Sequence, residues 1–223
     1  MPQGGIPLDT MPALILVDSE VIAQSDVRYL RAGIIDALAK WVEFEPYQRH
    51  NPHQLALDLK VSTARRATEI FLRWGEAAIN ANQQQQVNQA LEKVIEANIV
   101  LAGLANSIRG PLDTPGLAHV IHDTLTHQPE LHDWLHGEKV GYSLLIQSLV
   151  DNPEGQPDSE LLTLLRRMAA LNASQQPPLD NRVRDMPVII SATICPTVTL
   201  ISQASPSMFV FLPRAFRIYF ASN

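Results

Sequence analysis

Apolar residues recur at the three- and four-residue spacing of α-helices through most of the first 172 residues. The first helix is expected to begin after Asp26, because aspartate is a favoured N-cap residue. The next helix is expected to open at Asn51-Pro52, which combines an N-cap residue with a proline in the first turn, and to run towards Asn80. In the first helix the apolar positions share one face: Val27, Leu30, Ile34, Leu38 and Trp41.

Four more helices follow in the pattern. The third runs from about 86 to 108 and is ended by Gly110-Pro111, as a C-terminal glycine followed by proline does. The fourth opens at Thr114-Pro115, the fifth begins near His136, and the sixth follows Ser159. The pattern therefore predicts an all-α fold, a helical bundle without a sustained repeat.

The two ends of the chain differ from this bundle. Residues 12–18 form a short apolar run with an acidic stop, which predicts one buried strand. The segment 186–223 contains two charges, four phenylalanines and several prolines, which favours an irregular or strand-like tail that is prone to association. The predicted division is 1–22 for the strand and its exit, 23–175 for the helical metal-binding domain, and 176–223 for the Pro/Ser/Phe-rich tail.

Composition narrows the class of protein. With 46% hydrophobic and 18% charged residues, the chain can bury a sizeable core. A net charge of -6 without a block of lysines or arginines argues against nucleic acid as a partner. The prolines of the uncharged tail argue against a membrane span. A single cysteine, Cys195, and a start that lacks a signal-peptide pattern predict a cytoplasmic protein.

Five of the seven histidines lie between residues 119 and 136, where an even spread would place fewer than one. His119 and His122 are spaced i, i+3 and share a helix face, whereas His136 opens the next helix. A catalytic metal usually takes three protein ligands and leaves one position open, so two histidines plus a carboxylate would form a suitable set. The alternative is that these histidines are surface or capping residues, which is the interpretation we favour for His127 and His132.

Several separated motifs support the metal interpretation. Residues 117–123 (LAHVIHD) and 136–140 (HGEKV) closely resemble the paired histidine motifs of glycerol dehydrogenases in the iron-containing (group III) alcohol dehydrogenase family. Residues 17–22 (VDSEVI) and 28–41 resemble the strand exit and the helix that carries the metal-binding aspartate in that family. The motifs occur in the family's order, and the resemblance covers about residues 12–172.

The resemblance implies a fold and a set of ligands. The fold would be the C-terminal helical domain of a dehydroquinate synthase-like, group III alcohol dehydrogenase. Asp36, His119 and His136 would bind one divalent metal, either zinc or iron. His122 would be a catalytic residue that either supports the metal ligands from behind or lies on the substrate side, near the reacting carbon. The chemistry would be alcohol oxidation, in which the metal lowers the pKa of the substrate hydroxyl and hydride leaves for NAD(P).

The chain also departs from the family pattern. No segment resembles a glycine-rich phosphate loop, so the NAD(P) site is not expected in this chain and a separately encoded N-terminal cofactor domain becomes a candidate partner. Ile35 stands where glycerol dehydrogenases usually show glycine, and it could crowd the metal site or pack away from it. The segment 106–113 differs from the family, which leaves the substrate open among small polyols, alcohols and hydroxy acids.

The sequence therefore predicts part of a metal-dependent, NAD-linked, glycerol-type alcohol dehydrogenase. The resemblance to that family also implies a homo-oligomer. The isolated chain is expected to be inactive, because the cofactor site is missing. Two alternatives remain: a non-catalytic metal-binding protein derived from such a dehydrogenase, and an interaction protein that docks through an apolar surface. The composition changes abruptly at Met186, which indicates either a recombined or frame-shifted end or an unfamiliar native tail.

Overall fold

The computed structural model describes residues 12–151 and 159–169. Within these two ranges all regular structure is helical, which confirms the predicted all-α fold. A π-helical segment, η1 (Ala97–Leu101), and a 3-10 turn, η2 (Pro129–Leu131), supplement the α-helices. The α-helices are α1 (Ser19–Gln24), α2 (Val27–His50), α3 (Leu55–Gln83), α4 (Gln89–Glu96), α5 (Ala102–Ser107), α6 (Leu117–Leu125), α7 (His136–Asp151) and α8 (Ser159–Ala169).

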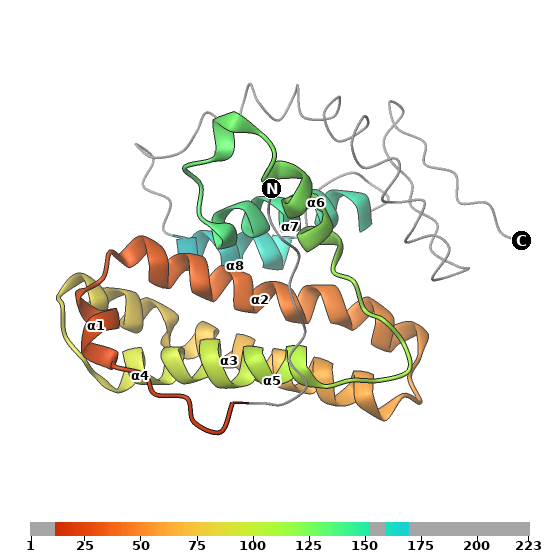
Figure 1. The fold of residues 1–223 in the computed structure, drawn as a ribbon, viewed down its shortest axis with the longest axis horizontal. Coiled ribbons are helices and arrows are strands. Elements are labelled where there is room, and N and C mark those ends of the chain that lie inside the picture. Colours follow the sequence, from red (N-terminus) through yellow and green to blue (C-terminus); the bar gives the residue numbers. More distant parts are fainter. Residues whose placement is uncertain (1–11, 152–158, 170–223) are drawn as a thin grey trace, which may run out of the picture.

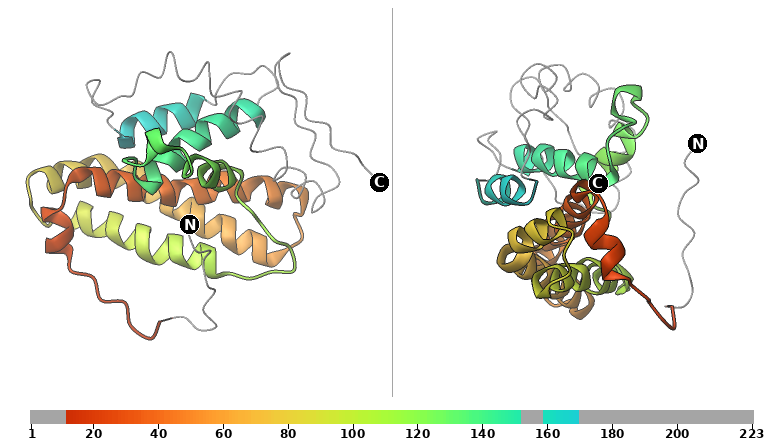
Figure 2. Two further views of the ribbon diagram at one scale, coloured as in Figure 1. Left: turned by 45° about the horizontal axis from the view of Figure 1, so that its top comes forward. Right: turned by 90° about the vertical axis from the view of Figure 1, so that its left-hand side faces the viewer.

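Helix α2 lies at the centre of the arrangement. On one side α2 packs against α3, and α4, η1 and α5 form one continuous helix that lies mainly along α3 (Figures 1 and 2). On its other side α2 packs against α7 and α8. Helix α6 packs mainly on α7 and reaches α2 as well. A helix that is covered on most sides needs apolar and small residues around most of its circumference. The buried apolar residues of α2 include Leu30, Ala32, Ile34, Ile35, Ala37, Leu38 and Ala39.

The boundaries of α2 confirm one prediction and correct another. Asp26 is the N-cap, and its carboxylate accepts a hydrogen bond from the backbone N–H of Arg28 at 2.9 Å. The expected helix start at Asn51-Pro52 is wrong, because Asn51 is the C-cap of α2 and its N–H donates to the carbonyl of Tyr47. Helix α3 begins only at Leu55.

The strand expected within residues 12–18 is absent, and no other strand occurs in the described part of the chain. Leu14 and Leu16 are 77% and 89% exposed, so this apolar run is not buried. A strand needs a neighbouring strand to satisfy its backbone groups, and no described segment lies there to pair with it. The chain instead enters a short helix, α1, whose N-cap Asp18 accepts a hydrogen bond from the N–H of Glu20.

The remaining helices follow the predicted order with shifted starts. The third predicted helix corresponds to α4, η1 and α5, and begins after the N-cap Asn88. The fourth begins at Leu117 rather than at Thr114-Pro115, with Gly116 at its N-cap. The fifth and sixth begin at His136 and Ser159, as predicted. The predicted tail lies outside the described residues.

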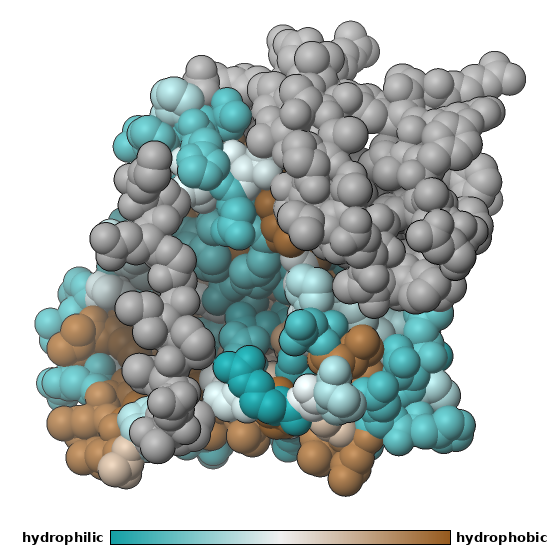
Figure 3. All heavy atoms as spheres, turned by 45° about the vertical axis from the view of Figure 1, so that its right-hand side comes forward, coloured by the Kyte–Doolittle hydropathy of each residue, from teal (hydrophilic) through white to brown (hydrophobic). Residues whose placement is uncertain are grey.

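One main core joins the two sides of α2. Its largest fully buried side chains are Ile34, Leu38, Phe71, Leu91, Leu144 and Met168. Apolar residues also reach the surface in patches at the lower left and along the bottom of the face that Figure 3 shows, interspersed with polar residues. Among the helices of the described residues, none has the length and apolar character needed to cross a membrane.

Candidate metal centre

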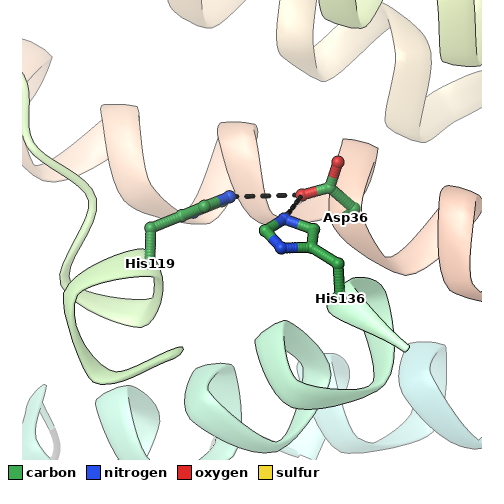
Figure 4. A group of neighbouring side chains, drawn as sticks. All are labelled: Asp36, His119 and His136. Atoms are coloured by element: carbon green, nitrogen blue, oxygen red, sulfur yellow. Dashed lines mark hydrogen bonds and ion pairs between the residues drawn. The ribbon is translucent and has the colours of Figure 1, made fainter. Parts of the chain in front are cut away.

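Three helices bring together the three residues predicted to bind a metal. Asp36 lies in the middle of α2, His119 in the first turn of α6, and His136 at the first position of α7 (Figure 4). The Oδ1 atom of Asp36 lies 3.2 Å from Nε2 of His119 and 3.2 Å from Nε2 of His136. One donor atom from each residue lies within 4.8 Å of the others.

Two glycines set the distance between α7 and α2. A Cβ atom at Gly137 would lie 1.9 Å from the backbone oxygen of Ala32, and one at Gly141 would lie 2.8 Å from Cγ2 of Ile35. Both distances are shorter than a real Cβ contact, so only glycine allows the two helices to approach this closely. Gly137 lies against Ala32, which precedes Asp36 by one turn of α2. Because His136 directly precedes Gly137, this close contact keeps the His136 side chain within reach of Asp36.

The turn before His136 is fixed by an arginine of α2. Arg28 donates from Nη2 to Oε2 of Glu138 at 2.6 Å and to the backbone oxygen of Asp133 at 2.7 Å. Glu138 also accepts a hydrogen bond from the N–H of Leu135 at 2.8 Å, just before the first turn of α7. These contacts attach the start of α7 to the start of α2, which orders the backbone that carries His136.

His119 is held by a second carboxylate from α2. Glu43 is 4% exposed, and its Oε1 atom accepts a hydrogen bond from the backbone N–H of His119 at 2.9 Å. The Nδ1 atom of the His119 ring lies 2.8 Å from Oε2 of Glu43. The imidazole therefore lies between two carboxylates, with Nδ1 towards Glu43 and Nε2 towards Asp36.

The electrostatics of the site follow from these contacts. Burial alone would raise the pKa of Asp36, but the hydrogen bonds from His119 and His136 and the nearby Lys40 ammonium hold it well below its usual range. Burial lowers the pKa of His119, whereas its hydrogen bonds to Asp36 and Glu43 raise it, with a net value of about 9. Without a bound cation, the site at neutral pH thus holds an imidazolium between two carboxylates.

The donor set fits a divalent metal such as zinc or iron. Imidazole nitrogen and carboxylate oxygen are common zinc ligands, with bonds of about 2.0–2.2 Å, so two donors of one tetrahedral ion lie about 3.3 Å apart. The two distances of 3.2 Å from Asp36 to His119 and His136 match that separation. The His136 side chain is 51% exposed, so the site is open to solvent on that side.

His122 lies next to this group but on the other side of the His136 ring. Its Nε2 atom lies 2.9 Å from Nδ1 of His136, and its Nδ1 atom lies 3.2 Å from Oδ1 of Asp123. Burial and the neighbouring His136 lower the pKa of His122. His127 and His132 are exposed and do not belong to the cluster, as expected.

Comparison with known proteins identifies relatives of the chain. No family model matches it. A glycerol dehydrogenase from Pseudomonas putida is 35% identical over 161 residues, and one from Thermotoga maritima is 38% identical over 149 residues. The chain is a homologue of glycerol dehydrogenases. The matches cover 70% and 64% of this chain but only 43% and 39% of the two relatives, so the chain spans less than half of their length.

A solved structure agrees with this assignment. The chain is similar in structure to a probable glycerol dehydrogenase from Sinorhizobium meliloti, with a TM-score of 0.57 and 26% sequence identity. The match covers 84% of this chain and 50% of that one. The likeness therefore extends from the sequence motifs to the arrangement of the helices.

Ile35 does not crowd the candidate metal site. Its side chain is 5% exposed and belongs to the main core, and its Cγ2 atom faces Gly141 of α7. Since successive residues of a helix point about 100° apart, Ile35 packs into the core while Asp36 faces the histidines. The absence of a side chain at Gly141 leaves room for the Ile35 side chain.

Sequence reasoning missed two charged residues of the site. Lys40 and Glu43 follow Asp36 at four and seven positions, so all three share one face of α2. Lys40 is 6% exposed, and its ammonium lies 3.1 Å from the backbone oxygen and 3.4 Å from Oδ2 of Asp36. The signal was available in the sequence, because Asp36, Lys40 and Glu43 are the only charged residues within the otherwise apolar stretch 32–44 and share one side of the helix.

Proposed function

We propose that this glycerol dehydrogenase homologue is the metal- and substrate-binding part of a metal-dependent, NAD-linked alcohol dehydrogenase. The substrate class would be a small polyol, alcohol or hydroxy acid. Asp36, His119 and His136 would hold the metal, either zinc or iron. The observation that carries the proposal is the convergence of two imidazole nitrogens on one carboxylate oxygen, each at 3.2 Å, from three different helices.

The metal, when bound, supplies Lewis acidity that lowers the pKa of the substrate hydroxyl. The residues of the chain orient the site around it. If Nε2 of His136 binds the metal, its Nδ1 carries the proton and donates to Nε2 of His122, and Nδ1 of His122 then donates to Asp123. His122 thereby holds the His136 ring in place. We assign it to the substrate side of the site as a catalytic residue.

In this proposal NAD(P) is bound by a domain that is not among the 223 residues of this sequence. This assignment rests on the sequence, in which no segment resembles a glycine-rich phosphate loop. Within the chain, residues 23–175 would form the metal-binding domain of a cytoplasmic homo-oligomer. The chain alone is then expected neither to bind NAD nor to oxidise glycerol, because hydride transfer requires the nicotinamide to be held against the substrate.

Cobalt substitution tests the proposed function directly, because the visible absorption of Co²⁺ reports on its ligands. The chain loaded with Co²⁺ is titrated with glycerol, 1,2-propanediol and lactate. A saturable spectral change with at least one of them, weakened in His122→Ala and unchanged in His127→Ala, would support a substrate-binding metal site.

Two other outcomes would point to the alternative functions. Stoichiometric cobalt binding without any response to hydroxyl compounds would favour a non-catalytic metal-binding protein. A chain that is folded but takes up no metal would favour an interaction protein. Either result would overturn the proposed function.

A further inference from the structure

Glu43 is a buried acidic side chain without a lysine or arginine partner among the described residues. It is 4% exposed, and its one ion-pair partner in this part of the chain is the His119 ring. Burying a carboxylate is unfavourable unless hydrogen bonds and an opposite charge compensate for the lost solvation. The contacts of Glu43 with α6 provide that compensation.

The carboxylate makes two kinds of contact with the same residue. It accepts a hydrogen bond from the backbone N–H of His119 at 2.9 Å, in the first turn of α6, where the helix lacks internal acceptors. It also lies 2.8 and 3.0 Å from Nδ1 of the His119 ring. One side chain of α2 therefore fixes both the backbone and the ring of His119.

The N-terminus of α6 is shaped to admit this side chain. Its N-cap residue is Gly116, which has no side chain to cap the helix. A Cβ atom at this position would lie 2.1 Å from Oε1 of Glu43. Glycine here leaves the space that the Glu43 carboxylate occupies, so the carboxylate of another helix replaces the usual N-cap side chain.

The orientation of the ring follows from the chemistry of its two neighbours. A carboxylate accepts hydrogen bonds, so Nδ1 of His119 must carry a proton when it faces Glu43. In neutral imidazole the lone pair is then on Nε2, which lies 3.2 Å from Oδ1 of Asp36. Two lone pairs at that distance repel each other unless a proton or a metal ion lies between them, so a metal ion that replaces the proton meets the lone pair of Nε2. Glu43 thus leaves Nε2 as the ligand atom.

We propose that Glu43 is a positioning residue, which strengthens metal binding by holding His119 with Nδ1 protonated and Nε2 directed at the site. This inference rests on the proposed function, in which Asp36, His119 and His136 bind the metal. Carboxylates that accept a hydrogen bond from a metal-bound histidine typically change metal affinity by about 10- to 100-fold. Capping of α6 alone would stabilise the fold but would not select the ring nitrogen.

Glu43→Gln tests the proposal, with Glu45→Gln as its matched control. The glutamine has almost the same volume and keeps one acceptor oxygen, so we expect the helices to form. Glu45 lies on the same helix, but it is partly exposed and pairs with Arg49. Competition with a chelator measures zinc affinity, and circular dichroism checks the fold. We expect zinc binding about 10- to 100-fold weaker in Glu43→Gln and unchanged in Glu45→Gln.

Nitrogen-15 NMR of the histidine rings supplies a readout that a purely structural role would not move. In the zinc-loaded wild type, His119 should show a protonated Nδ1 and a metal-bound Nε2. A wild-type spectrum with Nδ1 bound to zinc would overturn the proposal without any variant, even if Glu43→Gln failed to fold.

The failures of the two proposals can be told apart. A wild type that binds zinc, loses it in His119→Ala and keeps wild-type affinity in Glu43→Gln would refute only the role of Glu43. A wild type that binds no zinc would overturn the proposed function and the role of Glu43 with it.

Discussion

The close contact between α7 and α2 makes Gly137→Ala the sharpest perturbation of the site. The new Cβ atom would lie 1.9 Å from the backbone oxygen, 2.5 Å from the carbonyl carbon and 2.8 Å from Cα of Ala32. Ordinary van der Waals contact begins at 3.4 Å, so the helices must separate by about 1.5 Å. Backbone atoms cannot rotate away as a flexible side chain can.

This displacement predicts two effects of different size. Overpacking of this kind costs about 1–3 kcal/mol, which should lower the free energy of unfolding. His136 would move away from Asp36 with α7, and the 3.2 Å separation of their donor atoms would grow beyond what one ion can span. Ligand distances in metal sites lie within about 0.2 Å of their usual values, so zinc affinity should fall at least as far as the roughly 10- to 100-fold loss typical when a group that orients a ligand is removed.

Urea unfolding and chelator competition measure the two effects, and Gly103→Ala provides the control. Gly103 lies inside α5, and a Cβ atom added there would meet nothing within 4 Å. Alanine is favoured over glycine in a helix by about 1 kcal/mol, so this control should be slightly more stable and bind zinc normally. Wild-type stability and zinc affinity in Gly137→Ala would refute the argument that glycine sets the helix spacing.

Two further predictions concern charge and buried polarity. At pH 7 zinc binding should release a proton from His119, because its pKa of about 9 keeps the ring protonated, and the apparent affinity should rise as the pH approaches 9. Calorimetry in buffers of different ionisation enthalpy counts the protons, and a count of zero would contradict the assignment. Asn82→Ala should lose about 1–3 kcal/mol of stability in urea unfolding, since the Asn82 amide donates to the carbonyls of Ile22 and Ser25. The exposed Asn80→Ala should change little, and equal losses in both variants would count against the role of these hydrogen bonds.

Much of the fold was predictable because its signals are local. The Asp26 cap, the apolar face of α2 and the starts of α7 and α8 depend on residues within a few positions of one another. The strand expected at 12–18 failed for the opposite reason. A short apolar run has no fixed conformation by itself, and its pairing depends on segments far away in the sequence.

The start of α3 shows a similar limit. Asn followed by proline fits both a helix N-terminus and the end of a preceding helix, and the sequence does not say which one applies. In the structure α2 continues through Pro46 to His50, and the N–H of Asn51 completes its last turn. Because α2 extends as far as His50, Asn51 ends that helix and does not begin the next one.

The histidines of the candidate site could be predicted from the sequence, whereas the Glu43 carboxylate that holds His119 could not. The spacing of the histidines suggested a metal site, and the family resemblance supplied Asp36 as the third member. The role of Glu43 depends on the absence of a side chain at Gly116, 73 positions away in the sequence. Such a pairing between a buried charge and a distant glycine becomes visible only when α2 and α6 are placed side by side.

The central claim is that Asp36, His119 and His136 together bind one metal ion, and native mass spectrometry of the zinc-loaded chain tests it most directly. The wild type and a His127→Ala, His132→Ala double variant should each carry one zinc ion per chain. Asp36→Asn, His119→Ala and His136→Ala should each lose it while keeping their helical circular dichroism. Retention of zinc by these three variants, with its loss in the double variant, would contradict the account.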